Sequence, residues 1–310
     1  MKMKMIAFLF GSAVVAAAGL MSRTASSCPP GAAEPAGPWL QGWSRTISGE
    51  AMGYHSPYRD ISSALIARAT DGTMTVSWET APVPADFADD AATFIWMCGL
   101  ATQKGAHRFE MKIDGRPFLA FRTGKDATEK TWTLSGPDGA SLRFETTFVD
   151  QFDELFGFMF LRLPKSVLSP GRPIRIDVTG ENGGSRDWFM MFPTELTSWV
   201  RAGGEEALIR DKDGVRQSIR LEISHIAPAA RAEVKVSGKT LREDLALGYN
   251  RFQVPAEAVS APADVPIEVK IGDRPAERFT IRLNPVVRRE LWLLPHSHND
   301  IGYSDHQAVV

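Results

Sequence analysis

Apolar and polar residues alternate along much of the chain between residues 73 and 283. Segments 109–113, 174–178 and 219–223 place an apolar side chain at every second position, with a polar or charged one between. A period of two predicts β-strands that bury one face in a core and expose the other to water. The chain is therefore predicted to be mainly β, with antiparallel sheets.

Turn residues separate these segments at short intervals. Asp114-Gly115 stands between two alternating segments, and residues 136–139 read Gly-Pro-Asp-Gly between two more. Both are typical of tight turns that join neighbouring strands. Short strands with such turns predict two consecutive β-sandwich domains. These are a jelly-roll-like accessory sandwich over residues 39–194 and a small immunoglobulin-like sandwich over residues 195–287.

The hydrophobic pattern changes near the end of the chain. Leu291-Trp292-Leu293-Leu294 is a continuous apolar run that follows the charged residues 288–290. A strand buried on both faces has this pattern, as in a parallel sheet covered by helices. Residues 288–310 are therefore predicted to begin a different architecture, with the first strand of an α/β-barrel-like domain.

Residues 1–27 are predicted to be a signal peptide. Two lysines precede an apolar stretch over residues 6–18, which ends in small residues suitable for cleavage. The stretch is shorter than the roughly 20 residues that a membrane-spanning helix needs. We therefore expect a secreted or periplasmic protein with no stable membrane span.

The two cysteines have different surroundings. Cys28 opens residues 28–38, a segment rich in proline, glycine and alanine that is predicted to be a linker. Lipoprotein anchoring at Cys28 is an alternative, although the residue three places earlier is an alanine where a large apolar one is expected. Cys98 lies in the apolar run 94–98, which predicts a buried, unreactive thiol. A disulfide between the two is a further alternative.

Composition and charge narrow the classes of function. The chain of 310 residues is 44% hydrophobic and 23% charged, with a formal net charge of -2. A chain of this length is expected to hold two domains and flanking pieces. Its lysines and arginines are spread along the alternating segments. Binding to nucleic acid requires clustered basic residues that displace the counterions of phosphates, so no nucleic-acid partner is expected.

Three of the six histidines lie in the last fifteen residues, two of them in the segment His296-Ser297-His298-Asn299-Asp300. Side chains two apart on an extended backbone point the same way, so His298 and Asp300 can converge on one point. Imidazole and carboxylate ligands suit a divalent cation such as zinc. The sequence therefore predicts one divalent ion, such as zinc, bound by His298 and Asp300, with His296 near the same face. A histidine-rich strand end without metal is the alternative.

Residues 296–303, preceded by Pro295 and an apolar strand, resemble the start of the catalytic domain of glycoside hydrolase family 38, the α-mannosidases. The resemblance covers only about 20 residues. It implies a retaining glycosidase that acts on mannose-containing glycans, with zinc held by His298 and Asp300. The carboxylate nucleophile and acid/base of such an enzyme are expected downstream of Val310, so no catalytic residue is assigned here.

The resemblance thus implies the amino-terminal part of a secreted, metal-dependent α-mannosidase-like hydrolase, inactive as this fragment. Its residues 288–310 are expected to begin a truncated α/β-barrel-like catalytic domain. One alternative is a non-catalytic, exported carbohydrate-binding protein made of two β-sandwiches. Another is a different metallohydrolase, such as an amidohydrolase, in which His296 and His298 both bind metal.

Further candidates have weaker signals. Asp150, Asp153 and Glu154 form an acidic cluster beside aromatic residues, which the sequence does not distinguish from a solvated edge. His107 and His225 are isolated, so structural roles are expected. Four tryptophans outside the clearest alternating segments are candidates for stacking on sugars, although packing is their expected use: Trp39, Trp43, Trp188 and Trp199.

Overall fold

The structure of the chain is a computed structural model that describes residues 39–54, 61–102, 106–123, 130–211 and 214–287. Nearly all regular structure in these ranges is β-strand, and the described helical segments are two short 3-10 turns, η1 (Pro137–Gly139) and η2 (Lys165–Val167). Apart from one short parallel contact, the strand pairs are antiparallel. The prediction of a mainly β chain with antiparallel sheets is confirmed for these residues.

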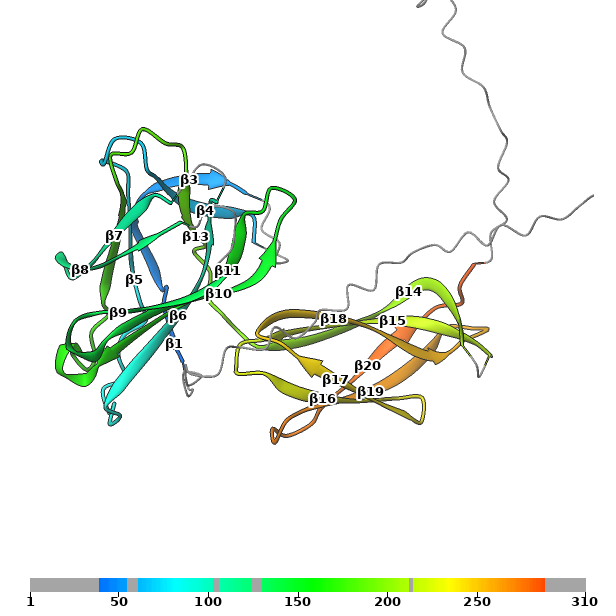
Figure 1. Ribbon diagram of the computed structural model, residues 1–310. Helices are drawn as coiled ribbons and strands as arrows, with labels where there is room; N and C mark the ends of the chain where they lie inside the picture. The colour runs from blue at the N-terminus through cyan, green and yellow to red at the C-terminus, as the bar shows by residue number, and fades with distance from the viewer. Residues whose placement is uncertain (1–38, 55–60, 103–105, 124–129, 212–213, 288–310) are drawn as a thin grey trace, which may run out of the picture. The chain divides into compact units, whose positions relative to one another are not determined.

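The first pair of sheets has eight and five strands (Figure 1). The larger sheet has the order β3-β4-β13-β6-β11-β10-β9, with β1 pairing in parallel with β6, and the smaller has the order β2-β5-β12-β7-β8. The strands are β1 (Leu40–Gln41), β2 (Arg45–Ser48), β3 (Glu50–Gly53), β4 (Ser63–Arg68), β5 (Thr75–Glu79), β6 (Ala91–Leu100), β7 (Arg108–Ile113), β8 (Arg116–Arg122), β9 (Thr131–Ser135), β10 (Ser141–Val149), β11 (Leu155–Pro164), β12 (Arg175–Gly180) and β13 (Trp188–Met191).

The second pair of sheets has three and four strands. The orders are β14-β15-β18 and β17-β16-β19-β20. Ile219, Leu221 and Ile223 of β15 alternate into the core that this pair encloses. The strands are β14 (Trp199–Asp211), β15 (Gly214–His225), β16 (Ala230–Val236), β17 (Lys239–Leu245), β18 (Gly248–Glu257), β19 (Ala263–Ile271) and β20 (Glu277–Leu283).

Three central strands of the eight-stranded sheet, β13, β6 and β11, bury both of their faces. Along β6, Phe94 and Trp96 face the core between the first two sheets. Ile95 and Met97 point the other way, into a second apolar layer that includes Leu247. The continuous apolar runs in these strands follow from this double burial, so such runs also occur in an antiparallel sheet.

Turn chemistry agrees with the sequence at two hairpins. Asp114 and Gly115, with φ of 49° and 77°, connect β7 to β8, and Asp138 has a φ of 54° between β9 and β10.

Cys98 is fully buried and is a free thiol, and burial raises its pKa well above the ordinary value. The predicted burial of this thiol is therefore confirmed, and Cys98 is a free cysteine.

Several predictions fall outside the described residues. The signal peptide and linker, with the lipid-anchoring alternative at Cys28, lie in residues 1–38, and the α/β-barrel-like strand lies in residues 288–310. The described part of the chain gives no support to an α/β-barrel. Its helical turns are too short to span a membrane, and no helix there is long and apolar enough to do so.

Candidate functional site

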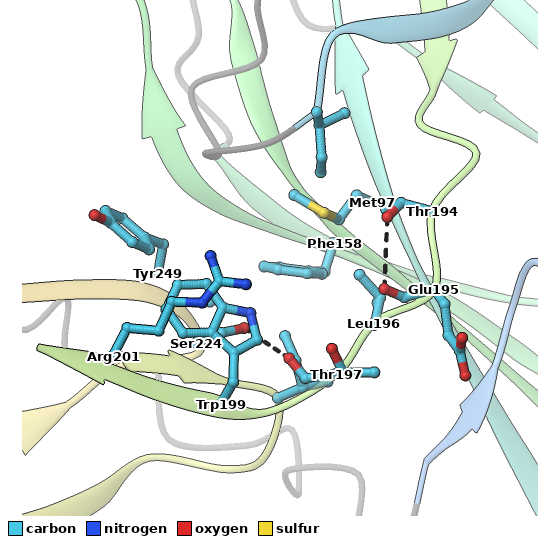
Figure 2. A pocket seen from close by; sticks show the side chains of 13 residues that line it. Met97, Phe158, Thr194, Glu195, Leu196, Thr197, Trp199, Arg201, Ser224 and Tyr249 are labelled. Carbon is cyan, nitrogen blue, oxygen red and sulfur yellow. Dashed lines mark hydrogen bonds between the residues drawn. The ribbon is translucent and has the colours of Figure 1, made fainter. Parts of the chain in front are cut away.

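A pocket of about 230 Å³ lies beside the first residues of β14 (Figure 2). Its apolar part comes from the outer face of the eight-stranded sheet, through Met97 of β6 and Phe158 of β11. Its aromatic wall comes from Trp199 of β14 and Tyr249 of β18. The remaining described residues that line it are Ile61, Thr194, Glu195, Leu196, Thr197, Arg201, Ser224, Ile226 and Gly248.

The register of the three-stranded sheet sets the order of residues in the aromatic wall. Trp199 lies opposite Ser224, and Ser224 lies opposite Tyr249, so the three form one row across the strands. The inward positions between them carry the core residues of β15. Alternation therefore turns this row outward, toward the pocket.

The segment before β14 is held by a side-chain amide from β1. Gln41 accepts a hydrogen bond at Oε1 from the backbone N–H of Leu196 at 2.8 Å. Its Nε2 donates to the carbonyl oxygen of Leu196 at 2.6 Å. Leu196 is buried in the same apolar layer as Met97 and Phe158. The two hydrogen bonds thus fix the edge of the pocket to the eight-stranded sheet.

Charged groups order the aromatic wall. The guanidinium carbon of Arg201 lies 4.3 Å from the centroid of the Trp199 ring. The Tyr249 hydroxyl donates a hydrogen bond to Glu222, a carboxylate with only 6% of its surface exposed. Arg220 lies 3.6 Å from the same carboxylate. The rings and polar groups of the wall are therefore held in place by contacts with one another.

The predicted zinc ligands lie elsewhere in the chain. His298 and Asp300, with the neighbouring His296, fall in residues 288–310, outside the described residues, so the zinc site stays a prediction. Within the described ranges, histidine, cysteine, aspartate and glutamate side chains form no group of three suited to a metal ion.

The isolated histidines have structural partners. His107 Nδ1 lies 3.1 Å from Glu181 Oε1, and its Nε2 lies 3.9 Å from Asp187 Oδ2. His225 is buried, and its Nε2 lies 2.8 Å from the carbonyl oxygen of Pro228. Burial lowers the pKa of His225, so the ring is held neutral. These contacts agree with the structural roles expected for both residues.

The four candidate tryptophans have different surroundings in the structure. Trp188 is buried and Trp39 packs edge-on against Phe160 at 5.0 Å, both in the second apolar layer. Trp43 packs against the core between the first two sheets. Trp199 alone of these four lines the pocket. Packing is thus the use of three of the four candidates.

The acidic cluster is more than a solvated edge. The backbone N–H groups of Phe152 and Glu154 donate to Asp150 Oδ1 at 2.8 and 2.9 Å, which folds the turn between β10 and β11. Burial, together with the charges of Asp150 and Asp187, raises the pKa of Glu154 to about 7. Burial also raises the pKa of Tyr54 to about 12, aided by the charges of Asp150 and Glu154.

Replacement of Glu154 by glutamine should remove a pH dependence of stability. The folded state keeps a proton on Glu154 that the unfolded state releases above its ordinary pKa of 4.5, so stability falls as the pH rises from 4.5 to about 7. Glu154 is partly exposed. After discounting for solvent screening, we expect Glu154→Gln to raise the free energy of unfolding at pH 8 by on the order of 1 kcal/mol. Denaturant titrations at pH 4.5 and pH 8 measure this.

The exposed Glu50 provides the control for that titration. Glu50→Gln should leave the difference in stability between the two pH values as it is in the unchanged protein. If Glu154→Gln shows the same loss of stability with rising pH as the unchanged protein, the proton is not held by Glu154.

No family model and no curated protein match the chain. A solved GH2 β-galacturonidase from Eisenbergiella tayi, bound to galacturonate, matches at 12% identity over 79% of this chain and 44% of that chain, with a TM-score of 0.20. A β-glucuronidase from Ruminococcus gnavus matches at 9% identity over 70% and 36%, with a TM-score of 0.24. The chain spans less than half the length of these two structures.

These comparisons correct the family expected from residues 296–303. The structural likeness is to GH2 β-galacturonidase and to β-glucuronidase, which point to a different family from the α-mannosidases of family 38. The expected α-mannosidase membership is therefore wrong. The resemblance depended on a short segment only, which is too little sequence to define a whole chain. At these TM-scores the function of the chain has to be argued from its own residues.

Proposed function

We propose that the chain is a carbohydrate-binding accessory part of a carbohydrate-processing enzyme of the glycosidase kind, and that the pocket beside β14 binds one sugar ring. The observation that carries the proposal is the pairing of the aromatic wall, Trp199 and Tyr249, with polar residues at the rim. A pyranose has apolar C–H faces and a hydroxyl edge, so it needs both kinds of surface. A few placed polar groups in an apolar setting are typical of small-molecule sites.

The size of the pocket supports a small ligand. Its volume of about 230 Å³ is below the roughly 300–1,000 Å³ of pockets for drug-sized molecules. The rim supplies hydroxyl groups from Thr194, Thr197 and Ser224. Ser224 Oγ donates to the carbonyl oxygen of Thr197 at 2.8 Å and keeps acceptor capacity for a ligand hydroxyl. We also propose that the protein is exported, from the signal peptide predicted over residues 1–27.

Replacement of Trp199 by alanine tests the proposal. The full chain is titrated with D-glucose, D-galactose, D-mannose and D-glucuronate, and binding is followed by tryptophan fluorescence and by NMR. We expect at least one sugar to bind, and Trp199→Ala to weaken that binding by about tenfold or more, because an aromatic anchor in a pocket dominates the binding energy.

Phe152→Ala is the matched control. Phe152 is an aromatic residue that is 55% exposed and lies in the turn between β10 and β11, away from the pocket lining. This variant should bind sugar as the unchanged protein does. Sugar binding that survives Trp199→Ala, or no response to any of the four sugars at millimolar concentration, would refute the assignment of this pocket.

A further inference from the structure

His225 is a buried histidine at the end of β15, next to pocket residues in the sequence but not itself in the lining. Its exposed fraction is 1%. The residues on either side of it, Ser224 and Ile226, both line the pocket. Gly248, which lies opposite His225 on β18, lines the pocket as well. A displacement of the His225 ring therefore reaches the pocket through the backbone around it.

The His225 ring has one nitrogen with a hydrogen-bond partner and one without. Nε2 lies 2.8 Å from the carbonyl oxygen of Pro228. A carbonyl oxygen only accepts, so Nε2 carries the proton and donates, and Nδ1 of the neutral ring carries none. Nδ1 is buried and has no hydrogen-bond partner among the described residues. A second proton on the ring would therefore place a positive charge and an N–H donor in a buried position without an acceptor.

The surroundings of the ring oppose a second proton. Gly248 has no side chain, and residues 226–229, which follow His225, read Ile-Ala-Pro-Ala. On the side of β14, Ser198 is neutral and accepts a hydrogen bond at Oγ from the Ile226 N–H at 3.1 Å. The charged group that acts on the ring is Arg274, in the turn between β19 and β20. Its charge repels a protonated imidazole.

Acid therefore favours a form in which water reaches the ring. Burial lowers the pKa of His225 most, and the charge of Arg274 lowers it further, against the hydrogen bond to Pro228. In an open form the ring has its ordinary pKa of 6.5. Because the open form binds the proton more readily, the closed form loses stability as the pH falls below 6.5. Above that pH the ring is neutral in both forms, and the closed form keeps its full stability.

Two hydrogen bonds join this end of β15 to the edge of the pocket. Ser224 Oγ donates to the carbonyl oxygen of Thr197 at 2.8 Å (Figure 2). On the other side of His225, the Ile226 N–H donates to Ser198. Rotation of the His225 ring toward water moves the backbone that carries both bonds. The pocket edge just before β14 then loses its attachment to β15.

We propose that His225 is an acid-sensitive switch beside the pocket: the neutral ring keeps residues 224–228 closed, and its protonation opens them together with the adjoining edge of the pocket. The switch goes beyond the proposed sugar binding, because it acts on the pocket whichever ligand the pocket holds. A ligand that contacts the closed edge is bound less tightly when the surroundings become acidic.

Hydrogen exchange of backbone amides in the full chain, measured by NMR at pH 7.5 and pH 5 without ligand, tests the proposal. We expect the protection factor of the Ile226 amide, corrected for the intrinsic exchange rate, to be about fivefold or more lower at pH 5. A drop from the open ring's pKa of 6.5 to pH 5 allows up to about thirtyfold. The amide of Ile219, a buried residue in the middle of β15, should keep its protection.

His225→Gln should remove the change at Ile226, because the glutamine amide can donate to Pro228 as Nε2 does and takes up no proton. His107→Gln is the matched control. His107 is a half-buried histidine that contacts Glu181 in the first pair of sheets, and its replacement should leave the change at Ile226 in place.

Three results would overturn the switch. One is equal protection of Ile226 at both pH values, and another is a change that persists in His225→Gln. The third is an equal change at Ile219, which would mean that acid unfolds the whole sheet and not the end of β15. An NMR titration of the His225 ring in the unchanged protein needs no variant, and a ring pKa at or above 6.5 would also contradict the proposal. These measurements use no sugar, so the proposed function stands or falls separately.

Discussion

Trp78→Ala should cost about 4 kcal/mol or more of the free energy of unfolding, the largest effect we expect from a single core substitution. Trp78 is fully buried, and its ring meets Trp96 edge-on at 5.6 Å in the core between the first two sheets. Its Nε1 donates a hydrogen bond to the carbonyl oxygen of Gly42 at 2.7 Å. Alanine leaves both a cavity and a buried acceptor without its donor.

Guanidinium chloride unfolding, followed by near-ultraviolet circular dichroism, measures this loss. Trp43→Ala is the control, because Trp43 is half-buried and its Nε1 bonds the exposed Thr46 hydroxyl at 3.2 Å. Trp43→Ala should lower the free energy of unfolding by much less than Trp78→Ala does. Trp78→Phe separates the two contributions, since it keeps most of the ring and removes the hydrogen bond. A loss below about 1 kcal/mol for Trp78→Ala would contradict the described core.

Gly157→Ala should destabilise the fold by about 3 kcal/mol, at the upper end of what overpacking usually costs. Gly157 lies in β11, where the register with β10 shifts between Thr146 and Phe148. A Cβ atom at this position would lie 1.9 Å from the carbonyl oxygen of Glu145 and 2.9 Å from the Cα atom of Thr146. Both neighbours are backbone atoms, so relief requires the two strands to move apart.

Gly53→Ala is the matched glycine control for thermal or denaturant unfolding. Gly53 also lies in a strand of the eight-stranded sheet, and a Cβ atom there would meet nothing within 4 Å. Its substitution should change stability by no more than about 0.5 kcal/mol. Equal effects of the two substitutions would show that β10 and β11 do not approach as closely as described.

The fold class was readable from the sequence because most strands expose one face. The alternating segments 109–113 and 219–223 lie in β7 and β15, and segment 174–178 begins one residue before β12. Polar residues at every second position keep the period of two visible in all three. Strand β13, at 188–191, has the sequence Trp-Phe-Met-Met and buries every residue. It therefore has no alternation of apolar and polar residues from which a strand could be predicted. Strand β14 carries Gly203 and Gly204 and a register shift beyond them, which interrupt the pattern.

The pocket was less readable than the fold. Its residues come from β6, β11, β14, β15 and β18, from the segment before β14, and from positions just before β4 (Ile61) and just after β15 (Ile226). Only the folded arrangement brings them together. Trp199 was a candidate from its position outside the clearest alternating runs, but Arg201 and Tyr249 carried no signal of their own. The cross-strand register, which is not a local property of the sequence, is what places these side chains at one site.

The double hydrogen bond between Gln41 and Leu196 has a practical consequence for proteolysis. It joins the second residue of β1 to a segment 155 positions away, in the stretch between Phe192 and Trp199 that has no regular strand of its own. Removal of the amide, as in Gln41→Ala, leaves that stretch with fewer backbone restraints. A protease would then be expected to cut there first, and to release two large β-rich pieces instead of many small peptides.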